Sequence, residues 1–114
     1  IREFIHGWYR VQAERYLPAR LNELAADIGV RPAAVRLKNL TARWGSCSSN
    51  RNINLNIKLM KCGRELIDYV LVHELVHLIE LNHSPRFWRK VGEYCPEYKR
   101  YREELKQKAY LLDW

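Results

Sequence analysis

Apolar residues in the opening segment recur three or four positions apart, which is the spacing of an amphipathic helix. Pro18 fits the first turn of a second helix, because a first-turn N–H has no intrahelical partner to lose. Gly29 is placed to end that helix in a left-handed conformation. We therefore predict two consecutive helices, with apolar stripes formed by Phe4, Ile5, Trp8, Val11 and Tyr16 and by Leu21, Leu24, Ala25 and Ile28.

The pattern then changes to the alternation of apolar and polar positions that is typical of half-buried strands. One alternating run starts at Val35 and continues to Trp44, with a phase slip near Asn39 where we expect a bulge. Residues 45–50 are rich in Gly, Ser and Asn and predict a turn. A second run follows, so the segment predicts an antiparallel hairpin. In this second run the apolar residues Ile53, Leu55 and Ile57 alternate with Asn52, Asn54 and Asn56.

From about Arg64 onward, apolar residues cover most of a helix surface, so we expect this helix to lie in the core. Asn82 is a suitable left-handed terminator for it. Ser84-Pro85 matches an N-cap followed by proline at the first helical position. Another helix follows Pro96. The fold class predicted is α+β: N-terminal helices, a small antiparallel sheet, a buried helix and C-terminal helices.

The length of 114 residues predicts a single domain spanning residues 1–114. Since the chain does not begin with Met, we expect it to be a fragment of a longer chain or a processed one. It contains neither an apolar run of the roughly 20 residues that a bilayer requires nor a signal peptide. Cys47, Cys62 and Cys95 form no C-x-x-C pair, and their odd number favours free thiols in the reducing cytoplasm.

The net charge of +7 is concentrated in one segment. Between Asp27 and Glu65 there is no acidic residue, whereas the rest of the chain is nearly balanced. A local positive field of this kind attracts anionic partners, nucleic acid among them. The eight basic residues of this 31–64 segment are Arg31, Arg36, Lys38, Arg43, Arg51, Lys58, Lys61 and Arg64.

The strongest chemical signal is the H-E-x-x-H motif formed by residues 73–77. Residues four apart on a helix lie on the same face, so His73 and His77 can bind one ion at about 2.0–2.1 Å. Glu74 projects to the side, where it can contact a water on the metal. Two histidines and a glutamate in a buried helix are costly unless something satisfies them, and a zinc ion would do so.

His83 is the preferred third ligand, because it follows the expected helix end and precedes the next N-cap. A carboxylate from Glu93 or Glu97 is the alternative. A structural zinc site would instead close its shell with a fourth protein ligand, and one of the three cysteines would have to supply it. Three His ligands and an adjacent Glu favour a catalytic site. The remaining histidine, His6, is isolated and is expected on a helix face.

Three stretches together resemble the YgjP-like metallopeptidase domain, which is related to the SprT-like and WLM-type zinc peptidases. They are Arg43-Trp44-Gly45-Ser46-Cys47, Asn52-Ile53-Asn54-Leu55-Asn56, and the run from Ile67 to Trp88. The resemblance extends from about Tyr16 to Tyr98. It implies a compact zincin fold, zinc ligands at His73, His77 and His83, and a catalytic Glu74. Members of the family usually carry a further N-terminal region.

The function predicted is hydrolysis of peptide bonds by water that Glu74 activates. The substrate is expected to lie along an exposed strand edge at Arg43 to Ser46, where Gly45 would allow close approach. Tyr94, Tyr98 and Arg86 are the candidates for stabilising the oxyanion, and the sequence does not choose among them.

A second hypothesis is a nucleic-acid-associated zinc protein, or a protease that acts on DNA-bound proteins. Its basis is the basic 31–64 segment and the ability of Trp44 to stack on a base. The competing interpretation is that edge-strand cations discourage aggregation and that Trp44 packs in the core.

Overall fold

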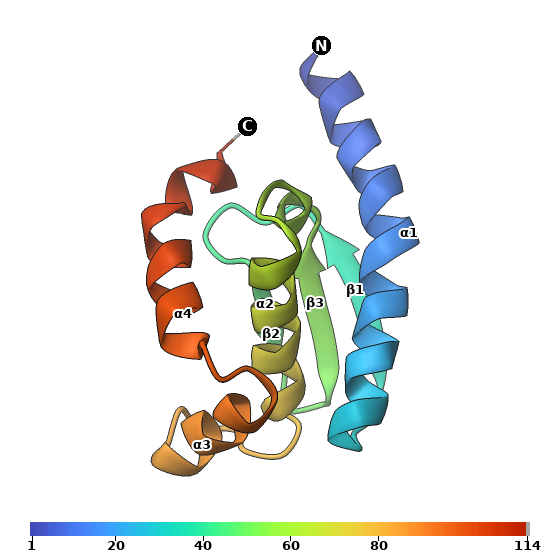
Figure 1. Ribbon diagram of the computed structural model, residues 1–114. Helices are drawn as coiled ribbons and strands as arrows, with labels where there is room; N and C mark the ends of the chain where they lie inside the picture. The colour runs from blue at the N-terminus through green and yellow to red at the C-terminus, as the bar shows by residue number, and fades with distance from the viewer. Residues whose placement is uncertain (114) are drawn as a thin grey trace.

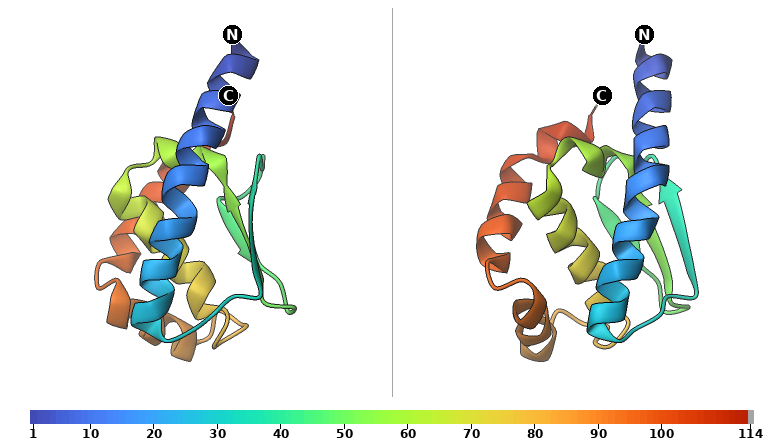
Figure 2. Two further views of the ribbon diagram at one scale, coloured as in Figure 1. Left: turned by 90° about the vertical axis from the view of Figure 1, so that its right-hand side faces the viewer. Right: turned by 45° about the vertical axis from the view of Figure 1, so that its right-hand side comes forward.

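The computed structural model describes residues 1–113 and places the helices on one side of a small sheet (Figure 1, Figure 2). In chain order the elements are α1 (Arg2–Ile28), β1 (Ala34–Lys38), β2 (Gly45–Cys47), β3 (Asn52–Asn56), the 3-10 helix η1 (Ile57–Lys61), α2 (Arg64–Val76), α3 (Pro85–Tyr94), α4 (Tyr98–Gln107) and the 3-10 helix η2 (Ala109–Leu112). Four α-helices and three strands within residues 1–113 confirm the predicted α+β class.

The N-terminal region is one helix, and the prediction of two helices separated at Pro18 is wrong. Pro18 lies inside α1, because the buried stripe runs through it without interruption. That stripe outweighs the backbone hydrogen bond that proline removes, a loss of about 3 kcal/mol. The first turns of α1 extend past the rest of the fold (Figure 1), and Phe4 and Trp8 are 77% and 53% exposed. The buried face of α1 consists of Ala13, Leu17, Leu21, Leu24, Ala25 and Ile28.

The sheet has the order β1-β3-β2, with β2 at one edge. The predicted hairpin exists, but β2 occupies residues that were expected to form the turn, and it pairs antiparallel with β3. The alternating run that starts at Val35 forms β1, which is parallel to β3, so the prediction of an entirely antiparallel sheet is wrong. The amide of the buried Asn56 explains the difference. It donates to the carbonyls of Leu40 and Arg43 and thereby holds residues 39–44 as a loop that redirects the chain.

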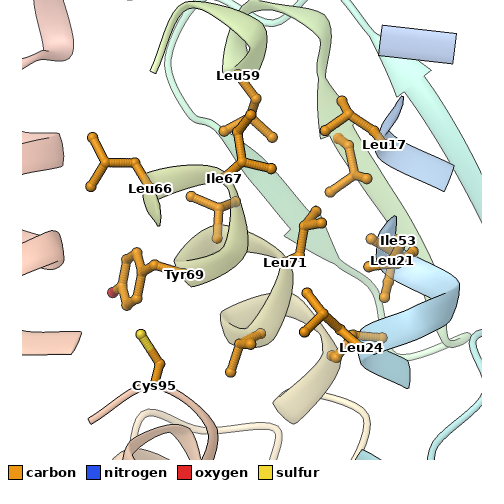
Figure 3. Packing of buried hydrophobic residues seen from close by; sticks show 14 of the residues in the cluster. Leu17, Leu21, Leu24, Ile53, Leu59, Leu66, Ile67, Tyr69, Leu71 and Cys95 are labelled. Carbon is orange, nitrogen blue, oxygen red and sulfur yellow. The ribbon is translucent and has the colours of Figure 1, made fainter. Parts of the chain in front are cut away.

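Helix α2 is the centre of the molecule, with α1, α3, α4 and β2 in contact with it. Side chains from α1, α2 and β3 converge in one core, in which Leu17, Leu71 and Ile53 are fully buried (Figure 3). The helix ends at Val76 and not near Asn82 as the sequence predicted. Backbone bonds from Leu78 N to Leu75 O and from Ile79 N to Val76 O tighten the chain there into a turn.

Helix α3 packs at the C-terminal end of α2, and α4 runs alongside α2 toward its N-terminal end (Figure 1). Ser84 caps α3 as expected, because its hydroxyl accepts a hydrogen bond from Phe87 N at 3.3 Å and Pro85 occupies the first turn. Helix α4 starts at Tyr98, two residues after the predicted restart at Pro96. None of the described helices has both the length and the apolar character that a bilayer-spanning segment needs.

Candidate metal centre

Three histidine side chains converge where α2 ends. His73 is in the last turn of α2, His77 is its C-cap, and His83 lies between the following turn and the cap of α3. The Nε2 atom of His83 is 3.0 Å from Nε2 of His77 and 3.2 Å from Nε2 of His73. Two ligands of one tetrahedral zinc ion lie about 3.3 Å apart. The three nitrogens therefore have the spacing of ligands around a single ion.

Contacts on the far side of each ring set its orientation. His77 Nδ1 is 3.2 Å from the Glu80 carbonyl, to which it donates, and this leaves the lone pair on Nε2. The ring of His83 stacks on Trp88 with centroids 5.6 Å apart, and Trp88 stacks in turn on Tyr98 at 5.3 Å. Within residues 1–113 the buried Nδ1 of His73 has no hydrogen-bond partner. The ring packs edge-on against Phe87 instead, with centroids 5.0 Å apart.

Burial favours the neutral form of His73 and His77. Burial is the largest cause that lowers the pKa of His73 to about 3, and the neighbouring His77, His83 and Arg102 contribute to this lowering in that order. Burial likewise lowers the pKa of His77, against the opposing effect of its bond to the Glu80 carbonyl. The neutral imidazole is the form that binds metal ions. The donor set, its spacing and the preference of His73 and His77 for the neutral form fit a zinc ion.

Glu74 is the buried carboxyl group beside this cluster, with 6% of the residue exposed. Burial raises its pKa to about 8, and the nearby Arg43 charge opposes that rise. The side chain packs against the edge strand: a β-carbon built on Gly45 would lie 3.3 Å from both Cγ and Oε2 of Glu74. His73, Glu74 and Gly45 also line a cavity of about 190 Å³. A buried carboxyl group thus lies between the histidine cluster and a strand edge.

The other sequence candidates lie elsewhere. Among residues 1–113, no carboxylate or thiol joins the three imidazoles in a group with ligand atoms within 4.8 Å of one another. Glu93 pairs with Lys90 at 3.3 Å and Glu97 with Arg100 at 3.4 Å. The structure therefore brings His83 and neither alternative carboxylate to the cluster. The three cysteines are free thiols, with Cys62 and Cys95 buried in the core.

The three oxyanion candidates are separated. Tyr98 stacks on Trp88 and is connected to the cluster through that ring. Arg86 lines a different cavity with Ile79 and Glu80. Tyr94 lies beside Lys90, whose ammonium is 5.7 Å from its ring. Sequence reasoning missed Trp88, Tyr69 and Arg102 as neighbours of the site. For Arg102 the sequence did contain a signal: the spacing of Tyr98, Arg102 and Leu105 puts these three residues on one face of α4.

Several charged side chains of the basic 31–64 segment donate hydrogen bonds to backbone carbonyls of distant segments. Lys58 is 1% exposed, and its ammonium donates to the carbonyls of Leu40 and Leu112. Arg51 donates to the carbonyls of Arg31 and Leu78. Trp44 is half-buried and lines the cavity beside Glu74. These contacts favour structural roles for this part of the segment.

Comparison with known proteins agrees with this geometry. A family model described as "YgjP-like, metallopeptidase domain" matches residues 1–108, a wider span than the motifs alone cover. The structure is similar to the metallopeptidase zymogen of Pyrococcus abyssi abylysin, with 28% identity, a TM-score of 0.68, and coverage of 77% of this chain and 90% of that one.

The zymogen of Methanocaldococcus jannaschii jannalysin has the same fold, with 22% identity, a TM-score of 0.67, and coverage of 77% and 91%. No curated protein gives a significant match. The comparisons support peptide or protein substrates and give no support to a DNA partner.

Proposed function

The chain belongs to the YgjP-like metallopeptidase domain family, and from that premise we propose that it hydrolyses peptide bonds with a zinc ion held by His73, His77 and His83. The observation that carries the proposal is the convergence of three Nε2 atoms within ligand spacing. Three imidazoles without a fourth protein ligand are typical of catalytic zinc sites, which keep one position open. When bound, zinc supplies a Lewis acid that lowers the pKa of water toward about 7 and polarises a carbonyl.

Glu74 is proposed as the general base and acid. It takes a proton from the attacking water at one carboxylate oxygen and later delivers that proton to the nitrogen of the leaving amine. Its buried position favours this role, because a carboxyl group in an apolar setting accepts a proton readily. The three free cysteines favour a reducing compartment such as the cytoplasm.

We propose that the substrate binds in extended form along the edge strand β2. Trp44 O and Ser48 N bond to Asn56 and Asn52 on the β3 side. Backbone direction alternates along an antiparallel pair, so Gly45 and Cys47 direct their N–H and C=O groups to the free edge. An extended peptide that adds there would pair by main-chain hydrogen bonds directly beside Glu74.

The test is Glu74→Gln, with Glu14→Gln on the exposed face of α1 as the matched control. Zinc content and cleavage of a mixed peptide pool are measured on both variants and on wild type. We expect Glu74→Gln to keep its zinc and to lose at least about 100-fold in cleavage rate, the lower end of general-base contributions. Glu14→Gln keeps both properties. A Glu74→Gln variant that cleaves at the wild-type rate contradicts the mechanism.

A further inference from the structure

A cavity of about 190 Å³ opens beside the proposed catalytic residues, between α2, α4 and the start of β2. His73 and Glu74 form part of its wall, so a peptide held along β2 would place one side chain in it. Cavities of about 150 Å³ hold a benzene ring, so this one accommodates a single substrate side chain. Its walls are therefore expected to select the residue next to the cleaved bond.

Most of the wall is apolar or aromatic, from Trp44, Val70, Leu105 and Tyr69. Arg102 of α4 is the exception, since among residues 1–113 it is the only cation of fixed charge in the lining. Arg102 is exposed, so water can solvate its charge in the empty cavity. An apolar substrate side chain that displaced this water would leave the charge without a partner, which is costly. The chemistry of the ligand therefore depends on what satisfies Arg102.

Arg102 is available for a ligand. It has no hydrogen bond or ion pair with any residue from 1 to 113. By contrast, the carboxylate of Glu97, the N-cap residue of α4, is paired with Arg100, and that of Glu104 within α4 is paired with Lys108. Its guanidinium lies 4.6 Å from the centroid of the Trp88 ring. Stacking fixes the plane of a guanidinium while leaving its N–H fork free to bind a carboxylate in bidentate geometry.

The Arg102 charge reaches the cavity from this position. Burial raises the pKa of Tyr69 to about 12, and the Arg102 charge opposes that rise. Arg102 also contributes to the lowered pKa of His73. Both residues line the cavity, so the Arg102 charge acts on the cavity wall.

We infer that this cavity is a specificity pocket for a substrate carboxylate and that Arg102 is the residue that selects it. The inference rests on the proposed peptide hydrolysis and names its substrate class. The carboxylate is either the side chain of an acidic residue next to the cleaved bond or the free C-terminus of a short substrate. The chemistry of recognition is the same for both.

The test uses zinc-loaded wild type, Arg102→Gln and the matched control Arg100→Gln, which removes a paired and exposed cation from the same helix. Cleavage sites in a degenerate peptide pool are identified by mass spectrometry. Values of kcat/KM are then measured for matched peptides with Glu, Gln or Leu in the selected position. A second pair of peptides carries a free or an amidated C-terminus.

In wild type we expect the carboxylate peptide to be preferred about tenfold or more over its amide, as for hydrogen bonds to charged groups. In Arg102→Gln this preference should fall below about twofold, because the charged hydrogen-bond donor is lost. In Arg100→Gln the preference should keep its wild-type value. Preference for Glu over Gln assigns the side chain, and preference for the free terminus assigns the C-terminus. Wild type that prefers neither Glu over Gln nor a free over an amidated C-terminus, or an unchanged preference in Arg102→Gln, overturns this inference alone. Wild type that cleaves no peptide overturns the proposed function and this inference with it.

Discussion

Gly45 is where the edge strand and the proposed base come closest, and this contact predicts the effect of a single methyl group. A β-carbon on Gly45 would lie 3.2 Å from the Asn54 carbonyl oxygen and 3.3 Å from Cγ and Oε2 of Glu74. Both distances are shorter than ordinary van der Waals contact, so the neighbours must move by a few tenths of an ångström. Gly45→Ala therefore displaces the carboxylate or the strand on which the substrate pairs.

The magnitude follows from how steeply catalysis depends on position. A misplacement of about 1 Å costs about 100-fold, so two or three tenths of an ångström cost about fourfold if the dependence is log-linear. That corresponds to about 0.8 kcal/mol in the activation free energy. The free energy of unfolding should change by less than about 1 kcal/mol, because the reduced entropy of the unfolded chain offsets the crowding.

The assay compares kcat/KM and urea unfolding for wild type, Gly45→Ala, Gly45→Val and the control Gly7→Ala. Gly7 is in α1 with no atom within 4 Å of an added β-carbon, so Gly7→Ala should gain about 0.5–1 kcal/mol in stability at unchanged kcat/KM. We expect kcat/KM to fall for Gly45→Ala and further for Gly45→Val. Wild-type kcat/KM in Gly45→Val would refute the idea that Glu74 needs this space.

Three further predictions concern metal binding, pH and stability. Trp88→Leu removes the ring on which His83 stacks and should weaken zinc binding about tenfold in a competition titration, whereas unchanged affinity would show that the stacking does not orient the ligand. In chelator-treated protein, Glu74 has a pKa of about 8 against 4.5 when unfolded, so its stabilisation is complete below pH 4.5 and is lost as the pH rises toward 8. His73, with a pKa of about 3 against 6.5, loses its stabilisation as the pH falls from 6.5 toward 3. Urea unfolding should therefore show a plateau between pH 4.5 and 6.5, and above it a decline of up to about 1.4 kcal/mol per pH unit that Glu74→Gln abolishes. Arg20→Gln breaks a bidentate pair with the carboxylate of Asp68 on α2, in which both hydrogen bonds are 2.9 Å long. Because the pair is partly exposed, its loss should lower the free energy of unfolding by about 1 kcal/mol. An unchanged urea midpoint would contradict this.

The proposed site could be read from the sequence because its parts are local. The i, i+4 spacing of His73 and His77 fixes a shared helix face whatever the tertiary fold. His83 was expected after a helix end near Asn82, and the helix in fact ends at Val76. His83 nevertheless joins the cluster, because the turn that begins at residue 77 folds the chain back toward α2.

The features that the sequence did not predict depend on contacts between distant segments. The direction of β1 follows from the amide of Asn56 holding the loop of residues 39–44, more than ten positions earlier. Pro18 has the local properties of a helix start, and only the continuous buried face of α1 overrides them. Arg102 reaches the cavity through the packing of α4 on α2, which no motif reports.

X-ray absorption at the zinc edge of the zinc-loaded chain tests most directly whether one ion is bound by three imidazoles. We predict scattering from three imidazole nitrogens at about 2.0–2.1 Å with one further oxygen and no sulfur. The imidazole signal should fall to two rings in His83→Ala. A sulfur scatterer at about 2.3 Å, or an unchanged three-imidazole signal in His83→Ala, would contradict the proposed centre.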